Sequence, residues 1–228
     1  ILSLILIMLG IGGYYGVNYY LKNKVVEVTD ETLKQNSFIY SDSSITVNYD
    51  GFAKGTTASG IALKLSEPFA DGKIENIFLE HSDSHTSVSK EEFMSIVGIS
   101  AGQTLIRSLG GNYMLGAYKT LTANEPFIAI EINNFDTVFA EMLKWEPKMI
   151  NDLRKIFGLT SLPQSISLSP KPFIDKVYLN QDTRVVLMPA TNEPVLFYTF
   201  LDTKTLLIAK NPTIITELQN RLITGANK

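Results

Sequence analysis

Hydrophobic and polar residues alternate with different periods along this chain, and the first pattern is a mostly apolar run without charge. From Ile1 to Leu21 there is no charged residue, and about 20 such residues span the hydrocarbon core of a bilayer. Tyrosines gather just before Lys22 and Lys24, as aromatic rings do at a membrane interface. The pattern predicts a transmembrane helix over residues 1–22. A cleaved signal peptide is the alternative, but no small-x-small cleavage site follows the run.

Residues 23–37 are polar and charged without a sustained apolar stripe, so they predict a juxtamembrane linker or short stalk. The folded domain is expected over residues 38–228, with a sub-boundary near residue 110 as an alternative. Because the chain opens on Ile1 rather than Met, we expect a cytoplasmic segment to precede it. The positive-inside rule compares both flanks of an anchor, so charge leaves the orientation open.

The first part of the domain shows period-two alternation that predicts three strands, over residues 44–49, 61–65 and 73–80. Ser89 and Glu92 have the spacing of a capping box, so a helix is expected to begin there and to end at Gly98. A second short helix is predicted over 103–109. Gly110 and Gly111 then predict a turn into strands over 113–119 and 127–132.

The longest helix is predicted over residues 135–157, because apolar residues recur there at three- and four-residue spacing. All of them are expected to face the core. They are Phe135, Val138, Phe139, Met142, Leu143, Met149, Leu153 and Ile156. Pro147 predicts a kink or break at Trp145 to Glu146, and Gly158 a terminal cap. Trp145 is expected to pack in the core with its neighbouring methionines, Met142 and Met149.

After a long loop over residues 159–172, four more strands are predicted, over 175–178, 184–188, 195–201 and 205–209. Asn211 and Pro212 predict the start of a final helix. Grouped strands followed by helices indicate the α+β class. We therefore expect mostly antiparallel sheet packed by helices, preceded by one transmembrane helix.

Composition narrows the functional classes. With 20 Lys+Arg against 23 Asp+Glu, there is no overall basic charge of the kind that binds nucleic acid, so no nucleic-acid partner is expected. The absence of cysteine excludes disulfides, iron–sulfur ligation and thiol nucleophiles. The 45% hydrophobic content is ample for a packed core.

Both histidines lie in one stretch, LEHSDSHTS, over residues 79–87. An extended backbone would place His81, Asp83 and His85 on one side, which is a ligand set for zinc or another divalent ion. The alternative is a solvated loop leading to the cap at Ser89. No catalytic residue is predicted, because the chain has no nucleophile elbow, phosphate loop or dinucleotide fingerprint. No cofactor is expected.

A few charged residues sit in otherwise apolar surroundings and are candidates to line a binding cleft. The simpler interpretation is that each of these residues lies on the solvated face of an amphipathic element. They are Arg107, Glu131, Asp152, Asp182 and Arg184. Ser87 to Lys90 also has the S-x-x-K spacing of penicillin-binding enzymes, but the companion elements of that site are missing.

The motifs YMLG, MLKWEPKMINDL and NQDTR are the most specific part of a resemblance that covers Phe93 to Leu222. The chain resembles a family of single-pass membrane proteins from ultra-small candidate-phylum bacteria. That resemblance implies an inside N-terminus and an uncharacterised extracytoplasmic domain. The resemblance implies no particular activity and no catalytic residue for this chain. Neither histidine lies in the matching part.

These patterns together predict a membrane-anchored extracytoplasmic binding or scaffolding domain of the bacterial cell envelope. It would be held in the lipid bilayer by residues 1–21 and would bind envelope proteins or a polymer. The alternative is an envelope hydrolase or metal-dependent enzyme that uses His81, Asp83 and His85. A structural spacer in a homo-oligomer is a third, since Gly12 and Gly16 have the spacing of closely packed membrane helices.

Overall fold

The computed structural model describes residues 38–225 apart from 52–55, 160, 168 and 170–171. The predicted transmembrane helix over 1–22 and the linker over 23–37 lie outside the described residues. Within the described part, no helix combines the length and apolar character that a membrane span requires. Ser37–Lys228 forms one compact unit that is not divided at residue 110.

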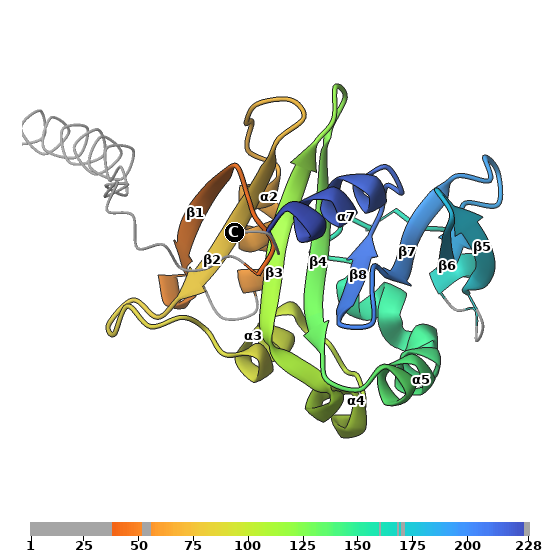
Figure 1. Ribbon diagram of the computed structural model, residues 1–228, viewed down its shortest axis with the longest axis horizontal. Coiled ribbons are helices and arrows are strands. Elements are labelled where there is room, and N and C mark those ends of the chain that lie inside the picture. Colours follow the sequence, from red (N-terminus) through yellow and green to blue (C-terminus); the bar gives the residue numbers. More distant parts are fainter. Residues whose placement is uncertain (1–37, 52–55, 160, 168, 170–171, 226–228) are drawn as a thin grey trace, which may run out of the picture. The chain divides into compact units, whose positions relative to one another are not determined.

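A single eight-stranded sheet organises the domain, in the order β1-β2-β3-β4-β8-β7-β6-β5 (Figure 1). Neighbouring strands are antiparallel except β1 and β2, which are parallel. This confirms the α+β class and the mostly antiparallel sheet. The strands are β1 Ser43–Asn48, β2 Ile74–Glu80, β3 Leu109–Lys119, β4 Asn124–Ile132, β5 Ile174–Tyr178, β6 Gln181–Leu187, β7 Pro194–Phe200 and β8 Thr205–Ala209.

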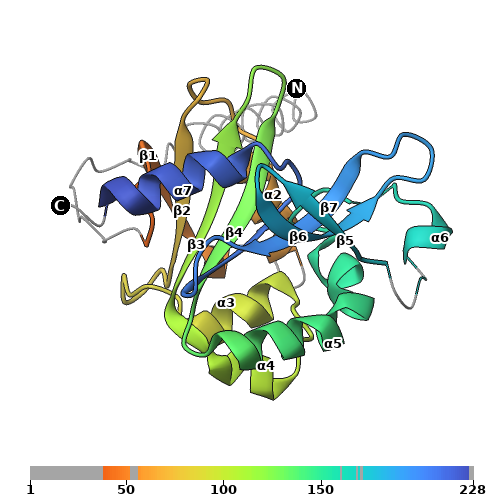
Figure 2. The same cartoon turned by 45° about the vertical axis from the view of Figure 1, so that its right-hand side comes forward.

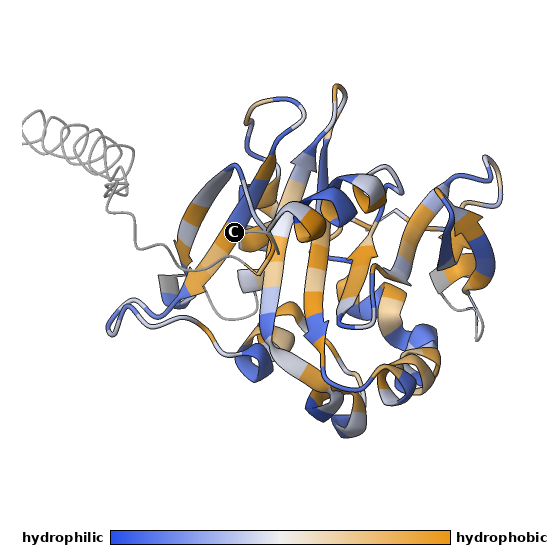
Figure 3. Cartoon of the chain, in the orientation of Figure 1, coloured by the Kyte–Doolittle hydropathy of each residue, from blue (hydrophilic) through white to orange (hydrophobic). Residues whose placement is uncertain are grey.

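Helices cover both faces of the sheet, with α7 on one face and α3, α4 and α5 on the other (Figure 2). The described helices are α2 Thr57–Leu65, α3 Lys90–Val97, α4 Gln103–Ser108, α5 Phe135–Leu153, α6 Gln164–Ser167 and α7 Ile214–Gly225, with a 3-10 turn at Tyr49–Gly51. Alternate residues of one strand therefore enter different cores. In β4, Ile128 packs on the α5 side and Phe127 on the α7 side. Hydrophobic residues accordingly fill the central strands (Figure 3).

The strand predicted over 61–65 is wrong, because these residues end helix α2. Ala58, Ile61 and Leu65 are its buried residues, and their three- and four-residue spacing is helical. Parallel neighbours need a crossover connection, usually a helix. Since β1 and β2 are parallel, the segment between them supplies that helix, which short alternation alone did not reveal.

The turn predicted at Gly110 and Gly111 is also wrong, because both residues belong to β3. The pairing of β3 with β4 shifts register between Leu109 and Tyr113, which accommodates the glycines as an irregularity within the strand. A Cβ at Gly110 would lie 2.5 Å from the Glu131 side chain. A larger residue at Gly110 would therefore force the Glu131 side chain to move.

Helix α5 starts where predicted but runs through Pro147 without a break. Its cap is Asn134, whose Oδ1 accepts from the Thr137 amide at 2.9 Å. The helix ends at Leu153 rather than 157, and Gly158 adopts φ +64° beyond that end. The capping box at Ser89 and Glu92 and the left-handed Gly98 after α3 are both confirmed.

Candidate functional site: an aromatic groove beside helix α5

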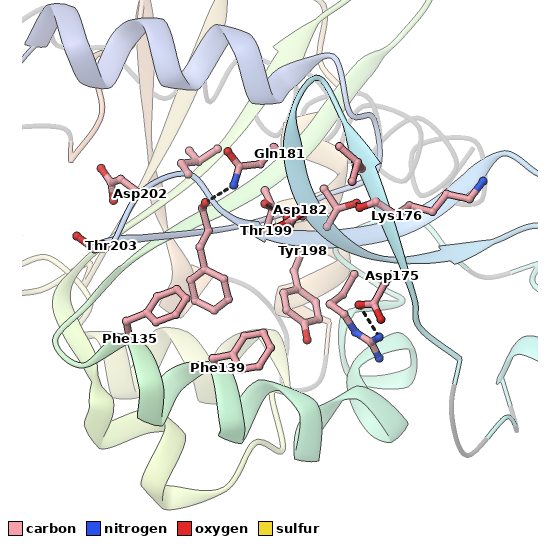
Figure 4. A pocket seen from close by; sticks show the side chains of 15 residues that line it. Phe135, Phe139, Asp175, Lys176, Gln181, Asp182, Tyr198, Thr199, Asp202 and Thr203 are labelled. Atoms are coloured by element: carbon pink, nitrogen blue, oxygen red, sulfur yellow. Dashed lines mark hydrogen bonds and ion pairs between the residues drawn. The ribbon is translucent and has the colours of Figure 1, made fainter.

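A pocket of about 810 Å³ lies between the first turns of α5 and the strands β5, β6 and β7 (Figure 4). We call it the aromatic groove. It is defined by Phe135, Phe139, Val177, Asp182, Tyr198 and Phe200. Its volume falls within the usual range for small-molecule and cofactor sites, about 300–1,000 Å³.

Helix α5 supplies the aromatic floor. Phe135, Phe139 and Leu143 are 40%, 41% and 39% exposed, so the prediction that the whole apolar stripe faces the core is wrong for these three. Residues at this four-residue spacing share one helix face, and the sheet leaves that face open. The Phe135 ring packs edge-on against Phe200, with centroids 4.8 Å apart.

The strands supply the opposite wall through side chains on the α5 face. Asp175 of β5 pairs with Arg184 of β6, and Arg184 pairs with Tyr198 of β7. Two residues further along β5, Val177 pairs with Asp182 of β6. Directly paired residues lie on the same face of a sheet, so these two rows of side chains look toward α5.

A buried ion pair holds this wall against the helix. Arg184 donates from Nε and Nη2 to the two carboxylate oxygens of Glu146, each at 2.7 Å. Tyr198 donates its hydroxyl to Glu146 Oε1 at 2.8 Å, and Glu146 is only 5% exposed. The hydrogen bonds that Arg184 donates to Glu146 raise the pKa of Arg184. Burial, and then the Glu146 charge, raise the pKa of Tyr198.

The rim of the groove carries excess negative charge. The Arg184 guanidinium is shared between Glu146 and Asp175, whose side chain lies 2.9 Å away and is 88% exposed. The carboxylate of Asp182 has no hydrogen-bond or ion-pair partner among the described residues. Lys176 points away from the groove (Figure 4). One guanidinium thus faces three carboxylates.

Two threonine hydroxyl groups in the groove make hydrogen bonds to backbone carbonyls. Thr183 donates to the Lys176 carbonyl at 2.7 Å, and Thr199 donates to the Asp182 carbonyl at 2.6 Å. Neither hydroxyl is paired with a base, as a nucleophile would need to be. The residues that line the groove therefore provide an apolar floor and charged rim suited to recognition.

The histidine loop has a different geometry from the one predicted. His81 lies 3.3 Å from the Tyr49 hydroxyl through Nδ1 and 3.4 Å from Glu92 through Nε2. Asp83 and His85 are exposed, and His85 adopts φ +51° in a turn. No group of three His, Cys, Asp or Glu side chains in the described part is arranged to hold a metal ion. Metal binding by His81, Asp83 and His85 stays a prediction.

Other sequence candidates have structural partners. Asp152 accepts from the Ser100 amide at 2.8 Å and from the Trp145 indole at 2.7 Å. Glu131 accepts from the Asn112 side chain. Arg107 lies exposed in the last turn of α4. Trp145 is buried, as are Met142 and Met149, which confirms the predicted core packing.

The lysine of the S-x-x-K spacing also has a structural role. Lys90 donates from Nζ to the carbonyl oxygens of Ile106 and Leu109, at 2.9 and 3.0 Å. These bonds anchor α3 to the end of α4. A lysine bonded in this way is held away from Ser87, which is exposed.

Of the five charged candidates, only Asp182 and Arg184 line the groove. The sequence feature that identified Asp182 and Arg184 was the presence of charged residues beside the apolar run VVLM. Phe135 and Phe139 were missed as site residues because their spacing is the same as that of the buried stripe. What exposes them is the placement of the strands opposite, which lies outside the local pattern.

No family model, no curated protein and no solved structure matches this chain. The resemblance to the candidate-phylum membrane family stays a prediction.

Proposed function

We propose that this protein is a membrane-tethered binding domain of the cell envelope whose aromatic groove takes a ligand with an apolar surface and a positive charge. The observation that carries the proposal is the pairing of exposed phenylalanines with an unneutralised carboxylate, Asp182, in one pocket. Placement outside the cytoplasm rests on the uncharged run from Ile1 to Leu21 and on the family resemblance.

The groove is pre-formed, which favours binding because little ordering is needed when a ligand enters. The Glu146 contacts fix Arg184 and Tyr198 from the helix side. Large exposed apolar side chains clustered on a monomer are characteristic of interaction sites. Phe135, Phe139 and Val177 form such a cluster around the opening.

The charged residues of the groove favour a cationic ligand over an anionic one. An anion would have to use Arg184, but that guanidinium already makes a bidentate bond to a buried carboxylate. Breaking a buried pair costs about 3–5 kcal/mol, so an anionic ligand gains little. A cation approaching Asp182 displaces only water, and a phenyl ring can also attract it by a cation–π contact.

Two probes that share a phenyl group on a short alkyl chain and carry opposite charges test this proposal: phenylbutylamine and phenylbutyrate, titrated into the full chain in lipid nanodiscs. We expect the amine to bind and the carboxylate to bind at least about tenfold more weakly. Phe139→Ala should weaken amine binding about tenfold, and Asp182→Asn about fivefold. The measurement is isothermal titration calorimetry.

The matched control is Leu121→Ala, which removes an 89% exposed leucine from the β3–β4 hairpin. Because this residue does not line the groove, its loss should leave both titrations unchanged. Equal binding of the two probes, or equal effects of Phe139→Ala and Leu121→Ala, would contradict the proposal.

A further inference from the structure

Strand β5 forms one edge of the sheet and pairs only with β6 among the described strands. Tyr178 and Gln181 face each other across the two-residue turn Leu179-Asn180, whose φ angles are +53° and +61°. Such a turn, with both central residues at positive φ, matches the twist of a hairpin. The register of β5 is therefore fixed by its turn.

That register decides which backbone groups of β5 point outward. Residues that flank a two-residue hairpin turn exchange hydrogen bonds with each other, and bonding then alternates along the strand. Counting back from Tyr178, the backbone groups of Lys176 face β6, and those of Asp175 and Val177 face the free edge. The side chains of these same two residues lie on the α5 face and line the groove.

The two edges of the sheet differ in character. On β1, the four exposed side chains are all polar: Ser43, Ser44, Thr46 and Asn48. On the β5 hairpin, by contrast, Ile174, Val177 and Leu179 are exposed by 46%, 65% and 56%. Charge, proline and bulges protect free edges in natural proteins, and Asp175 and Lys176 place charge on β5, so an added strand has to match that charge. An edge with this much exposed apolar surface is suited to pairing.

We propose that an extended segment of a partner protein adds to β5 as an antiparallel strand, with the inward pattern apolar-x-basic. Its apolar side chain would lie opposite Val177, and its lysine or arginine opposite Asp175. Backbone hydrogen bonds to Asp175 and Val177 would supply affinity, and the side chains specificity. This inference rests on the proposed function and names its ligand class.

Charge favours a different protein over a second copy of this chain. A second β5, paired antiparallel, would present its own Asp175 and Val177 on the inward face. It would bring no positive charge to Asp175 or Asp182. Registers centred on Asp175 or Lys176 would place like charges opposite each other, which is destabilising.

The test uses a short fluorescein-labelled polythreonine peptide that carries the triplet Val-Thr-Lys, and the full chain in nanodiscs. Binding is followed by fluorescence anisotropy. N-methylation of the valine and lysine amides, which would face β5, should weaken binding at least about tenfold. N-methylation of the threonines on either side, whose amides face solvent, should change it by less than about twofold.

Reversing the charge at Asp175 tests the register of the added strand on β5. Asp175→Lys should lose affinity for the Val-Thr-Lys peptide and gain it for a Val-Thr-Glu peptide, because the facing charge is reversed. Asp83→Lys is the matched control, since Asp83 is equally an exposed aspartate but lies in the histidine loop. It should leave both affinities unchanged. The reversed triplet, Lys-Thr-Val, should bind more weakly than Val-Thr-Lys.

One outcome would overturn strand addition and leave the groove function intact. In that outcome, Phe139→Ala weakens binding of the peptide, but the position of N-methylation has no effect. Binding of phenylbutylamine without any binding of the peptide would also overturn strand addition and leave the groove function intact. Self-association of the full chain that the unlabelled peptide abolishes would assign the edge to a second copy and overturn the proposal of a different partner.

Discussion

At the scale of single residues, the contact that shapes the groove is the one between Glu146 and Arg184. Both oxygens of a nearly buried carboxylate are bonded to one guanidinium, and a buried tyrosine hydroxyl adds a third bond. Removing one partner of a buried pair leaves the other uncompensated. By contrast, the Asp175 side chain contacts the same guanidinium from solvent, where an ion pair contributes little.

We expect Glu146→Gln to lower the free energy of unfolding by about 3–5 kcal/mol, because Arg184 would keep its charge without its buried anion. Asp175→Asn, on the same guanidinium, should lower it by less than about 1 kcal/mol. Urea unfolding followed by the fluorescence of Trp145, the single tryptophan, gives both values. Similar losses for the two variants would show that the buried pair is not the anchor.

At the scale of elements, the segment leading into β1 is fastened to helix α7 through Asp42. Its carboxylate accepts from Arg221 Nη2 at 2.6 Å and from the Ile74 amide at 2.8 Å. Burial opposes ionisation of Asp42, but the hydrogen bonds from Ile74 and Arg221 outweigh it and lower the pKa. A group whose pKa falls on folding stabilises the protein only while it is ionised.

This shift predicts a pH-dependent contribution from Asp42. The stabilisation is fully present above the unfolded pKa, about 3.9, and is lost as the pH falls through the lower folded value. Asp42→Asn should therefore lower the free energy of unfolding by about 1–2 kcal/mol at neutral pH. The gap to wild type should close as the pH falls below about 4.

Urea titrations of both proteins between neutral pH and pH about 3 measure this gap. Asp83→Asn serves as the control, because Asp83 is exposed and has no described partner. A gap at Asp42 that persists unchanged in acid would show that its charge contributes nothing.

At the scale of the whole molecule, one sheet separates two cores, and the described helices leave one end of it uncovered. Helix α7 packs through Ile214, Ile215 and Leu218 against one face. On the other face, α5 buries Met142 and Met149 but leaves Phe139 open. The binding surface we propose is this uncovered end, together with the free edge of β5.

The membrane anchor is a prediction at this scale. The full chain should float with lipid vesicles in a density gradient, and Ile5→Arg with Leu9→Arg should release a large part of it. Each arginine at the centre of a membrane helix costs about 2.5–3.5 kcal/mol of insertion. Leu63→Arg with Leu121→Arg adds the same charge at exposed positions of the domain and should float like wild type.

Most elements were predictable from sequence because their signals are local. The capping box at Ser89 and the alternation in the second half depend on neighbours within a few residues. The errors share a different cause. Helix α2 was missed because β1 and β2 are parallel, and the continuation of β3 through its glycines was missed because it depends on pairing with β4. Both depend on partners distant in sequence.

The sequence by itself determined the class of fold, most of its elements and the charges Asp182 and Arg184 that border the groove. It could not determine which apolar residues are covered, because Phe139 and Met142 have the same helical signal and differ only in what lies opposite them. Strand order decides that. Only the tertiary structure placed β5 at an edge, left Phe135 and Phe139 open, and turned part of a core stripe into a candidate binding site.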